Sequence, residues 1–236
     1  MRRLAGIKKW EHPGWKSITM LLILVLVLPV SFIVIRFLSV DQADWGTLST
    51  TLLPLYISNT SYLVSGAILV TLAIGVSTAW VVTLYDFPFK KQFEWMLILP
   101  LAIPTYINAI AYVGLTDYAG PIRILLRSLG SDIYLDLMDS NGAIFVMSLV
   151  LYPYVYIASR AAFLLQSASL IEVSRSLGKS MSATFTKVVL PLAWPAIFSG
   201  LILVVMEVLN DYGVVQYYGV PTFTTGIFRS WLSLGN

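Results

Sequence analysis

The chain has 236 residues, of which 58% are hydrophobic and only 11% are charged, and its mean hydropathy is +0.81. Globular domains carry about 25% charged residues, so this composition excludes an ordinary soluble domain and indicates a membrane protein. There is no cysteine and one histidine, His12, which excludes a disulfide framework, a thiolate zinc site and a Cys–His nucleophile pair. The net charge of +3 is too small to indicate nucleic-acid binding.

Five uncharged stretches are long enough to cross a bilayer as helices, which takes about 20 apolar residues. In chain order they are residues 17–35, 61–85, 95–116, 142–159 and 190–206, and the last continues toward Asp211. The predicted fold class is therefore all-α, a polytopic transmembrane helical bundle.

Lys and Arg residues define the orientation, because basic residues near span ends are retained in the cytoplasm. With the N-terminus inside, eleven of the 15 basic residues fall in cytoplasmic segments. Residues 1–16 are then a cytoplasmic basic tail, residues 17–220 the transmembrane domain, and residues 221–236 an external tail with too few apolar residues to cross again. The first apolar run is longer than a signal-peptide core and lacks a following cleavage pattern, so we expect it to be retained.

Prolines and glycines inside the spans predict local features of the bundle. Pro100 and Pro104 in the third span and Pro153 in the fourth remove helix hydrogen bonds and predict kinks, which serve either packing or a pivot. Gly66 and Gly75 in the second span allow another helix to approach closely. The outer segment 120–141 is amphipathic and either lies on the membrane surface or contacts another protein.

The cytoplasmic segment 166–191, between the fourth and fifth spans, reads as a helix, a break and a second helix. The apolar positions of the first helix recur at helical spacing and are Leu170, Val173 and Leu177. Gly178 supplies the stop, and the second helix enters the fifth span through Leu190-Pro191. Such a helix pair needs a cover for its apolar face, which neighbouring helices or the lipid interface can supply.

The spacing in this segment resembles the EAA loop of ATP-binding cassette (ABC) importer permeases, E-A-A-x3-G-x9-I-x-L-P. The matching positions, all in register, are Glu172, Val173, Ser174, Gly178, Val188, Leu190 and Pro191. Valine and serine replace the two alanines, and valine replaces the isoleucine. The rest of the chain resembles the first half of ferric-iron type permeases, most clearly over residues 211–231.

The resemblance implies a type I ABC importer permease in the bacterial inner membrane, with no catalytic residue, cofactor or metal of its own. Its implied partners are a separate cytoplasmic ATPase dimer, an extracytoplasmic solute-binding protein, a second permease half or subunit, and membrane lipid, but no nucleic acid. The residues expected to couple to the ATPase are Glu172, Val173, Ser174, Leu177 and Gly178, with Leu190 and Pro191 orienting the fifth span. Because relatives resemble two fused six-span units, the chain is expected to be truncated before a sixth span. The implied cargo is ferric iron, with thiamine, polyamines, sulfate and other small solutes as alternatives.

Glu207, Asn210 and Asp211 lie near the outer end of the fifth span. An ionisable group at mid-bilayer costs about 2.5 to 3.5 kcal/mol on insertion scales, so these residues must face protein or water. They are either a polar patch on the substrate path or a solvated helix end.

Two other classes of function are weaker. An ion-coupled secondary transporter or channel would place ionisable groups at the membrane midplane, where these spans have almost none. A membrane-embedded enzyme would carry a catalytic motif, and none is present. Gly178-Lys179-Ser180 mimics the end of a phosphate-binding loop, but Val173 occupies the position of its first glycine.

Overall fold

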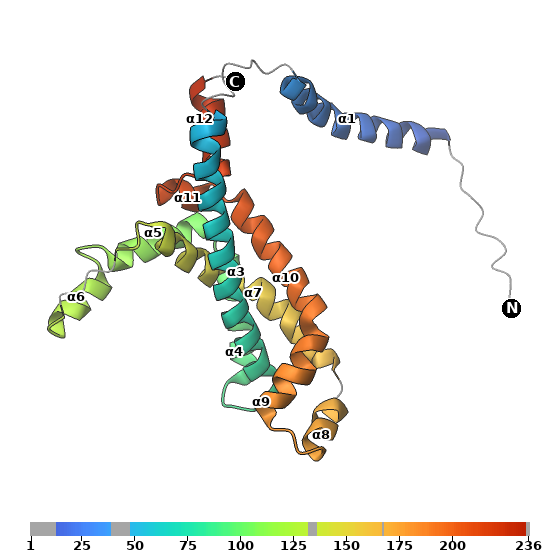
Figure 1. Ribbon diagram of the computed structural model, residues 1–236, viewed down its shortest axis with the longest axis vertical. Helices are drawn as coiled ribbons and strands as arrows, with labels where there is room; N and C mark the ends of the chain where they lie inside the picture. Colours follow the sequence, from blue (N-terminus) through green and yellow to red (C-terminus); the bar gives the residue numbers. More distant parts are fainter. Residues whose placement is uncertain (1–12, 39–47, 132–135, 167, 235–236) are drawn as a thin grey trace. The chain divides into compact units, whose positions relative to one another are not determined.

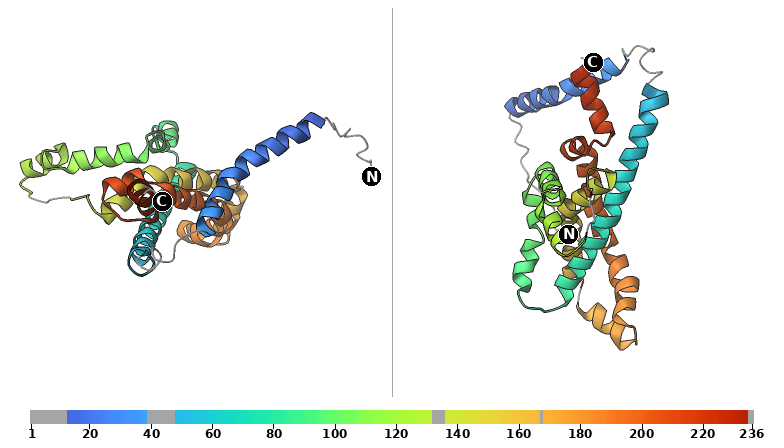
Figure 2. Two further views of the ribbon diagram at one scale, coloured as in Figure 1. Left: turned by 90° about the horizontal axis from the view of Figure 1, so that it is seen from above. Right: turned by 90° about the vertical axis from the view of Figure 1, so that its left-hand side faces the viewer.

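The computed structural model describes residues 13–38, 48–131, 136–166 and 168–234 (Figures 1 and 2). Most of the predicted basic tail, His12 included, lies outside these residues. The chain divides into two units, residues 1–51 and 52–236. In the first unit, helix α1 (Pro13–Leu38) contains the first predicted span, and its stretch Gly14–Ile35 has a mean hydropathy of 3.1. At about 1.5 Å per residue this stretch is long enough to cross a bilayer core of about 30 Å.

Three long helices form the centre of the second unit (Figures 1 and 2). They are α3 (Leu53–Leu84, preceded by the π-helical turn η1, Leu48–Leu52), α7 (Ser140–Leu165) and α10 (Leu190–Asn210). Helix α7 continues through Pro153 and packs against both of the others, most extensively against α3. Of its most apolar stretch 67% is buried, against 33% for the helices containing α3 and α10, so α7 is the central element of this unit.

Glycines allow the three helices to approach closely, as predicted for Gly66 and Gly75. A Cβ atom on Gly75 of α3 would lie only 2.7 Å from the Cβ atom of Val155 on α7. On the other side of α7, a Cβ atom on Gly200 of α10 would lie 2.9 Å from the carbonyl oxygen of Tyr154. Any larger residue at these positions would push the helices apart.

The third predicted span is broken, and the expectation of one helix over residues 95–116 is corrected. Its elements are α4 (Lys90–Met96), the 3-10 turn η2 (Leu99–Ala102), α5 (Thr105–Thr116) and α6 (Pro121–Ser128). The two halves meet at an angle of 99°. Pro100 and Pro104 lie at the break and have no N–H group to donate, so the helix ends where the prolines predicted a kink. By length and composition, the described residues hold four membrane-crossing helices, or five with this bent pair.

The remaining elements lie at the two ends of α10. Between α7 and α10 are α8 (Ala168–Ser176), α9 (Met181–Thr184) and the π-helical turn η3 (Phe185–Val189). After α10 come α11 (Gly213–Tyr217) and α12 (Phe223–Leu234), the latter within the predicted external tail. The start of α12 packs on α3, where the Phe223 N–H donates to the Thr60 hydroxyl over 3.3 Å and Asn59 Nδ2 donates to the Pro221 carbonyl over 2.9 Å.

Replacing Gly75 by valine is expected to destabilise the protein, because the new side chain meets Val155 and the backbone of α7. Overpacking of this kind typically costs about 1–3 kcal/mol, which thermal unfolding of the purified protein in detergent would detect. Gly114→Ala in α5 is the control, since nothing lies within 4 Å of a Cβ atom there. The Gly114→Ala protein should be as stable as the wild type or more stable. A Gly75→Val protein that is as stable as the wild type would contradict the packing described.

Candidate coupling segment and its contacts with the spans

We call residues 166–191, from the end of α7 to the start of α10, the coupling segment. Its first helix, α8, packs two of its residues against the rest of the protein, whereas its three predicted apolar positions are exposed. Ser174 is buried, and its hydroxyl lies 3.0 Å from the hydroxyl of Thr184 on α9; Ile171 packs against the core. The apolar positions predicted to share a face are instead exposed, at 41% for Leu170, 57% for Val173 and 76% for Leu177. The described residues therefore leave this apolar face uncovered.

Gly178 ends α8, as its position predicted. Its φ of +80° is a left-handed conformation that side chains other than glycine rarely adopt. The N–H of Lys179 donates to the Ser174 carbonyl and the N–H of Gly178 to the Arg175 carbonyl, which is the Schellman pattern of helix termination. A Cβ atom on Gly178 would meet nothing within 4 Å, so the backbone conformation alone requires glycine here. The result is a short helix with a defined end.

The second half of the coupling segment continues into α10 without interruption. Ser180 caps α9 by accepting from the Ala183 N–H over 3.2 Å. The N–H of Leu190 then donates to the Phe185 carbonyl five residues earlier, which defines the π-helical turn. The widened turn directly precedes Pro191, whose ring clashes with the carbonyl four residues back in a regular α-helix. Helix therefore runs from Met181 to Asn210.

An aromatic cluster attaches the coupling segment to two spans. The ring of Phe185 lies 4.4 Å, centroid to centroid, from Trp80 of α3 and 6.4 Å from Phe163 of α7. The rings of Trp80 and Phe163 are 5.8 Å apart, so the three side chains form one contact. Gln166 adds a hydrogen bond from its Nε2 atom to the Val189 carbonyl, over 3.1 Å. Sequence alone does not predict these contacts, since the residues come from segments far apart in the chain.

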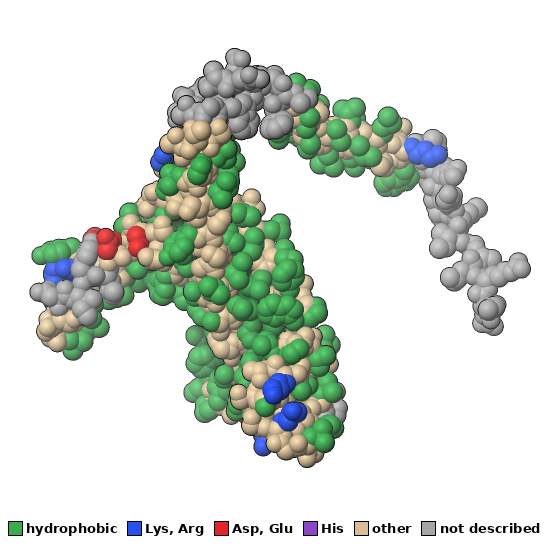
Figure 3. All heavy atoms as spheres, viewed as in Figure 1, with side chains coloured by type: hydrophobic (Ala, Val, Ile, Leu, Met, Phe, Trp, Pro, Cys, Tyr) green, Lys and Arg blue, Asp and Glu red, His purple; other side chains and the backbone are tan. Residues whose placement is uncertain are grey.

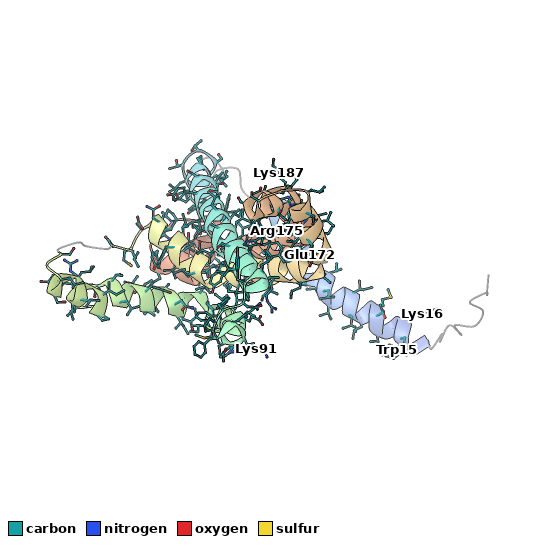
Figure 4. All side chains as sticks on the ribbon, turned by 90° about the horizontal axis from the view of Figure 1, so that it is seen from below. Trp15, Lys16, Lys91, Glu172, Arg175 and Lys187 are labelled. Atoms are coloured by element: carbon teal, nitrogen blue, oxygen red, sulfur yellow. The ribbon has the colours of Figure 1, made fainter. Side chains whose placement is uncertain are left out.

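Basic side chains gather at this end of the second unit. Figure 3 shows Lys and Arg side chains over α8 and α9, and Figure 4 shows Arg175 and Lys187 with Glu172 on the coupling segment and Lys91 on α4. The exposed side chain of Glu172 lies on the same helix as the uncovered apolar face. These are basic residues from which the cytoplasmic side of the segment is predicted, and that orientation stays a prediction.

An ion pair joins the first half of the broken span to α7 near the same end. Arg160 of α7 lies 2.9 Å from the Glu94 carboxylate of α4, and both side chains are about 30% exposed. The hydroxyl of Tyr156 donates to the Glu94 carbonyl over 3.1 Å. Pairing is required here, because an isolated charge near lipid is costly. The sequence shows that Glu94 and Arg160 each lie near the end of a span, but it does not show that they pair with one another.

The three residues predicted for the substrate path have different surroundings. Asp211 accepts from the Thr105 hydroxyl at the start of α5 over 2.5 Å, and from the Val214 N–H at the start of α11 over 2.7 Å. Glu207 accepts from the Tyr154 hydroxyl over 3.3 Å, and Asn210 is exposed. Asp211 therefore connects three elements at one end of α10. A role in the substrate path stays a prediction for all three. Within the described ranges, no group of three His, Cys, Asp or Glu side chains is placed to hold a metal ion.

Asp211→Ala should destabilise the protein more than Thr105→Val, because it removes both hydrogen bonds. A hydrogen bond to a charged group contributes about 1.5–3 kcal/mol, and a helix cap about 1 kcal/mol. In a double-mutant cycle followed by thermal unfolding, the two substitutions should be coupled by about 0.5 kcal/mol or more. Asn210→Ala is the control and should change little. Strictly additive losses would show that the bond between Thr105 and Asp211 contributes nothing.

Known proteins share this fold. The chain superimposes on a chain in the structure of a bacterial alginate ABC transporter in complex with an alginate pentasaccharide-bound periplasmic protein, with a TM-score of 0.66 at 20% identity. The match covers 94% of this chain and 87% of that one. An amino acid ABC transporter gives a TM-score of 0.55 at 16% identity, covering 84% and 85% of the two chains. The second unit, with its broken third span, therefore has the all-α fold of ABC importer permeases.

Sequence relatives point in the same direction. The chain is 30% identical over 221 residues to the Fe(3+)-transport system permease protein FbpB 2 of Haemophilus influenzae, covering 93% of this chain but 40% of that protein. It is 30% identical over 149 residues to a probable sulfate transport system permease protein of Chlorella vulgaris, covering 63% and 55%. It is 29% identical over 178 residues to a molybdate/tungstate transport system permease protein of Methanocaldococcus jannaschii, covering 73% and 68%. The chain thus spans about half the length, or less, of the first two relatives.

A family signature decides the assignment. The pattern described as the binding-protein-dependent transport system inner membrane component matches residues 71–230, from the middle of α3 to within α12. This range includes the broken third span, the coupling segment and α10. The chain belongs to the family of binding-protein-dependent transport system inner membrane components.

Proposed function

We propose that this chain is a permease component of an ATP-driven ABC importer, and that its coupling segment receives a separate cytoplasmic ATPase dimer. The chain itself hydrolyses nothing in this proposal. An extracytoplasmic solute-binding protein delivers the solute on the opposite side, and a second permease half or subunit completes the pathway. The protein lies in the bacterial inner membrane with its N-terminus in the cytoplasm.

The uncovered apolar face of α8 is the observation that carries the proposal. Leu170, Val173 and Leu177 are exposed, although Ser174, Thr184 and Val189 of the same segment are buried. Burying an exposed side chain of this kind contributes about 1.5–3 kcal/mol, so burying all three would contribute substantially to the binding of a protein. Arg175 and Lys179 are exposed in the same segment, and basic residues of this kind are retained on the cytoplasmic side, where a separate ATPase would bind.

The contacts behind α8 support its role as a mechanical link. Ser174 holds α8 against α9, and Phe185 anchors the following turn between α3 and α7. A displacement of α8 is therefore passed to a helix that runs without interruption to Asn210. A short rigid helix of this kind is what converts movement of an ATPase into movement of the spans.

An ion-coupled transporter is not favoured. Such proteins use ionisable groups near the membrane midplane. Helix α3 has no charged residue, α7 has Arg160, which pairs with Glu94 of α4, and α10 has Glu207 near its outer end.

Replacing Val173 or Leu177 by aspartate is expected to lower the amount of ATPase that co-purifies with the tagged chain by about tenfold or more. Each substitution removes an apolar contact and places a charge in it, while the exposed position keeps the fold intact. Ser176→Asp adds the same charge to the same helix, away from this face, and is the control. Unchanged ATPase recovery in both variants, with uptake intact, would contradict the proposal.

For the cargo, we propose ferric iron. The relative that transports Fe(3+) covers 93% of this chain, more than the sulfate and molybdate/tungstate relatives compared here. Cells that depend on this system should lose uptake of radioactive ferric iron when the chain is deleted and keep sulfate and molybdate uptake. Loss of sulfate or molybdate uptake alone would overturn the choice of cargo and leave the importer assignment in place.

A further inference from the structure

Helix α10 carries a single charged residue within its apolar length. Glu207 lies one turn before the end of the helix, and it is exposed although α10 packs against α3 and α7. The hydroxyl of Tyr154 on α7 donates to the Glu207 carboxylate over 3.3 Å. Neither of the two ion pairs in the described ranges involves this carboxylate. Glu207 therefore presents a negative charge on the outside of the packed helices.

The contact with Tyr154 places this charge inside the membrane. From Ser140, where α7 begins, to Tyr154 the helix rises about 21 Å, at about 1.5 Å per residue. Glu207 lies two turns beyond Gly200, where a Cβ atom would meet the Tyr154 carbonyl oxygen. The carboxylate is therefore in the outer half of the spans, below the outer end of α7. An ionised group is costly among acyl chains, so this side of α10 must face protein or water.

The exposed surface of α10 has two chemically different sides. The side that contains the carboxylate recurs at helical spacing, is exposed throughout and consists of Ser199, Leu203, Glu207 and Asn210. We call these four residues the polar side of α10. Phe198 and Ile202 lie elsewhere on the exposed surface, and they are 54% and 46% exposed. Lipid suits these two apolar residues, whereas water suits the polar side.

A second acidic residue, Asp211, follows directly after α10 but has a different environment. Its Oδ2 atom accepts from the Thr105 hydroxyl and its Oδ1 atom from the Val214 N–H, so both carboxylate oxygens hold neighbouring elements together. The carboxylate of Glu207 has one long hydrogen bond and is exposed. Of the two, Glu207 is therefore the carboxylate available to a solute.

We propose that the polar side of α10 lines the solute path and that Glu207 selects a cationic solute. This inference rests on the permease function proposed above and adds the charge of the solute. A carboxylate on the wall of a path attracts cations and repels anions, because few water molecules there screen its charge. Tyr154 is a positioning residue that holds the carboxylate. The path therefore admits a metal cation and disfavours oxyanions such as sulfate and molybdate.

The absence of cysteine allows a direct test of which side of α10 is wet. Single cysteines are introduced into the chain, purified with its accompanying subunits in lipid nanodiscs, and treated with a cationic, membrane-impermeant thiol reagent. Ser199→Cys and Leu203→Cys should be labelled at least about tenfold faster than Phe198→Cys and Ile202→Cys, because thiols ionise and react in water but not in lipid. A lipid-soluble maleimide should label the latter two, which confirms that they are intact.

Two results of the labelling would overturn the proposal. Equal labelling of all four positions would show that α10 has no distinct wet side. Protection of positions 199 and 203 from both reagents would show that a protein partner covers the polar side.

The role of the charge is tested by uptake of radioactive ferric iron into proteoliposomes, with ATP and the binding protein supplied. Glu207→Gln should lower uptake by about tenfold, and Glu207→Asp should keep most of it. Glu207→Cys should also lose uptake, regain it after reaction with a sulfonate-bearing thiol reagent, and stay inactive after reaction with a trimethylammonium reagent. A merely structural role would not distinguish these two reagents. Asp86→Asn, which removes an exposed carboxylate just after α3, is the control and should keep full uptake.

Uptake that survives Glu207→Gln, rescue by both reagents, or uptake of sulfate or molybdate by the wild-type complex would overturn the cation assignment. The amount of ATPase that co-purifies with the tagged chain is measured on the same samples. Normal recovery limits such a failure to the charge of the path. Loss of recovery from the wild-type chain would instead contradict the importer function on which the inference rests.

Discussion

The close approach of α3, α7 and α10 is the interaction on which the second unit depends. Between membrane helices there is no hydrophobic driving force, since lipid tails are as apolar as the side chains, so van der Waals contact must hold the helices together. Val155 of α7 meets both Gly75 of α3 and Gly200 of α10, and small residues on both sides make these contacts tight. The three helices therefore pack as one core at this level.

This packed core allows a small cytoplasmic helix to act on the spans. Phe185 packs against Trp80 and Phe163, which belong to the two helices that pack most extensively. The coupling segment is thus fixed to the core at its second half, while the outer face of α8 stays uncovered. One half of the segment is held by the spans and the other exposes an apolar face. This arrangement suits an element that binds a partner and transmits the partner's movement to the spans.

The broken third span shows a second constraint of the membrane. Breaking a helix frees backbone groups that lipid cannot satisfy, so such a break is tolerated where protein supplies contacts. Polar contacts hold each side of this break: Glu94 with Arg160 and Tyr156 on one side, Thr105 with Asp211 on the other. Because Asp211 follows α10 directly, the outer half of the broken span is attached to the same helix that begins at the coupling segment.

The sequence by itself determined the features that follow from local rules. Apolar length predicted the long helices, the prolines located the break, and the glycine after Leu177 located the end of α8, since each depends on neighbouring residues alone. The EAA-like spacing identified the family for the same reason. Helical spacing also grouped Leu170, Val173 and Leu177 correctly on one face.

Only the tertiary structure decided which way that face points and which distant residues meet. Ser174 and Ile171 face the protein because α9 and the core lie on that side, and nothing in the local sequence specifies this. The bond between Thr105 and Asp211 joins residues 106 positions apart, and the 99° turn at the broken span depends on such contacts. Contacts between residues far apart in the chain arise from helix packing. The sequence pattern predicts only where each helix begins, breaks and ends and which residues share a face of it.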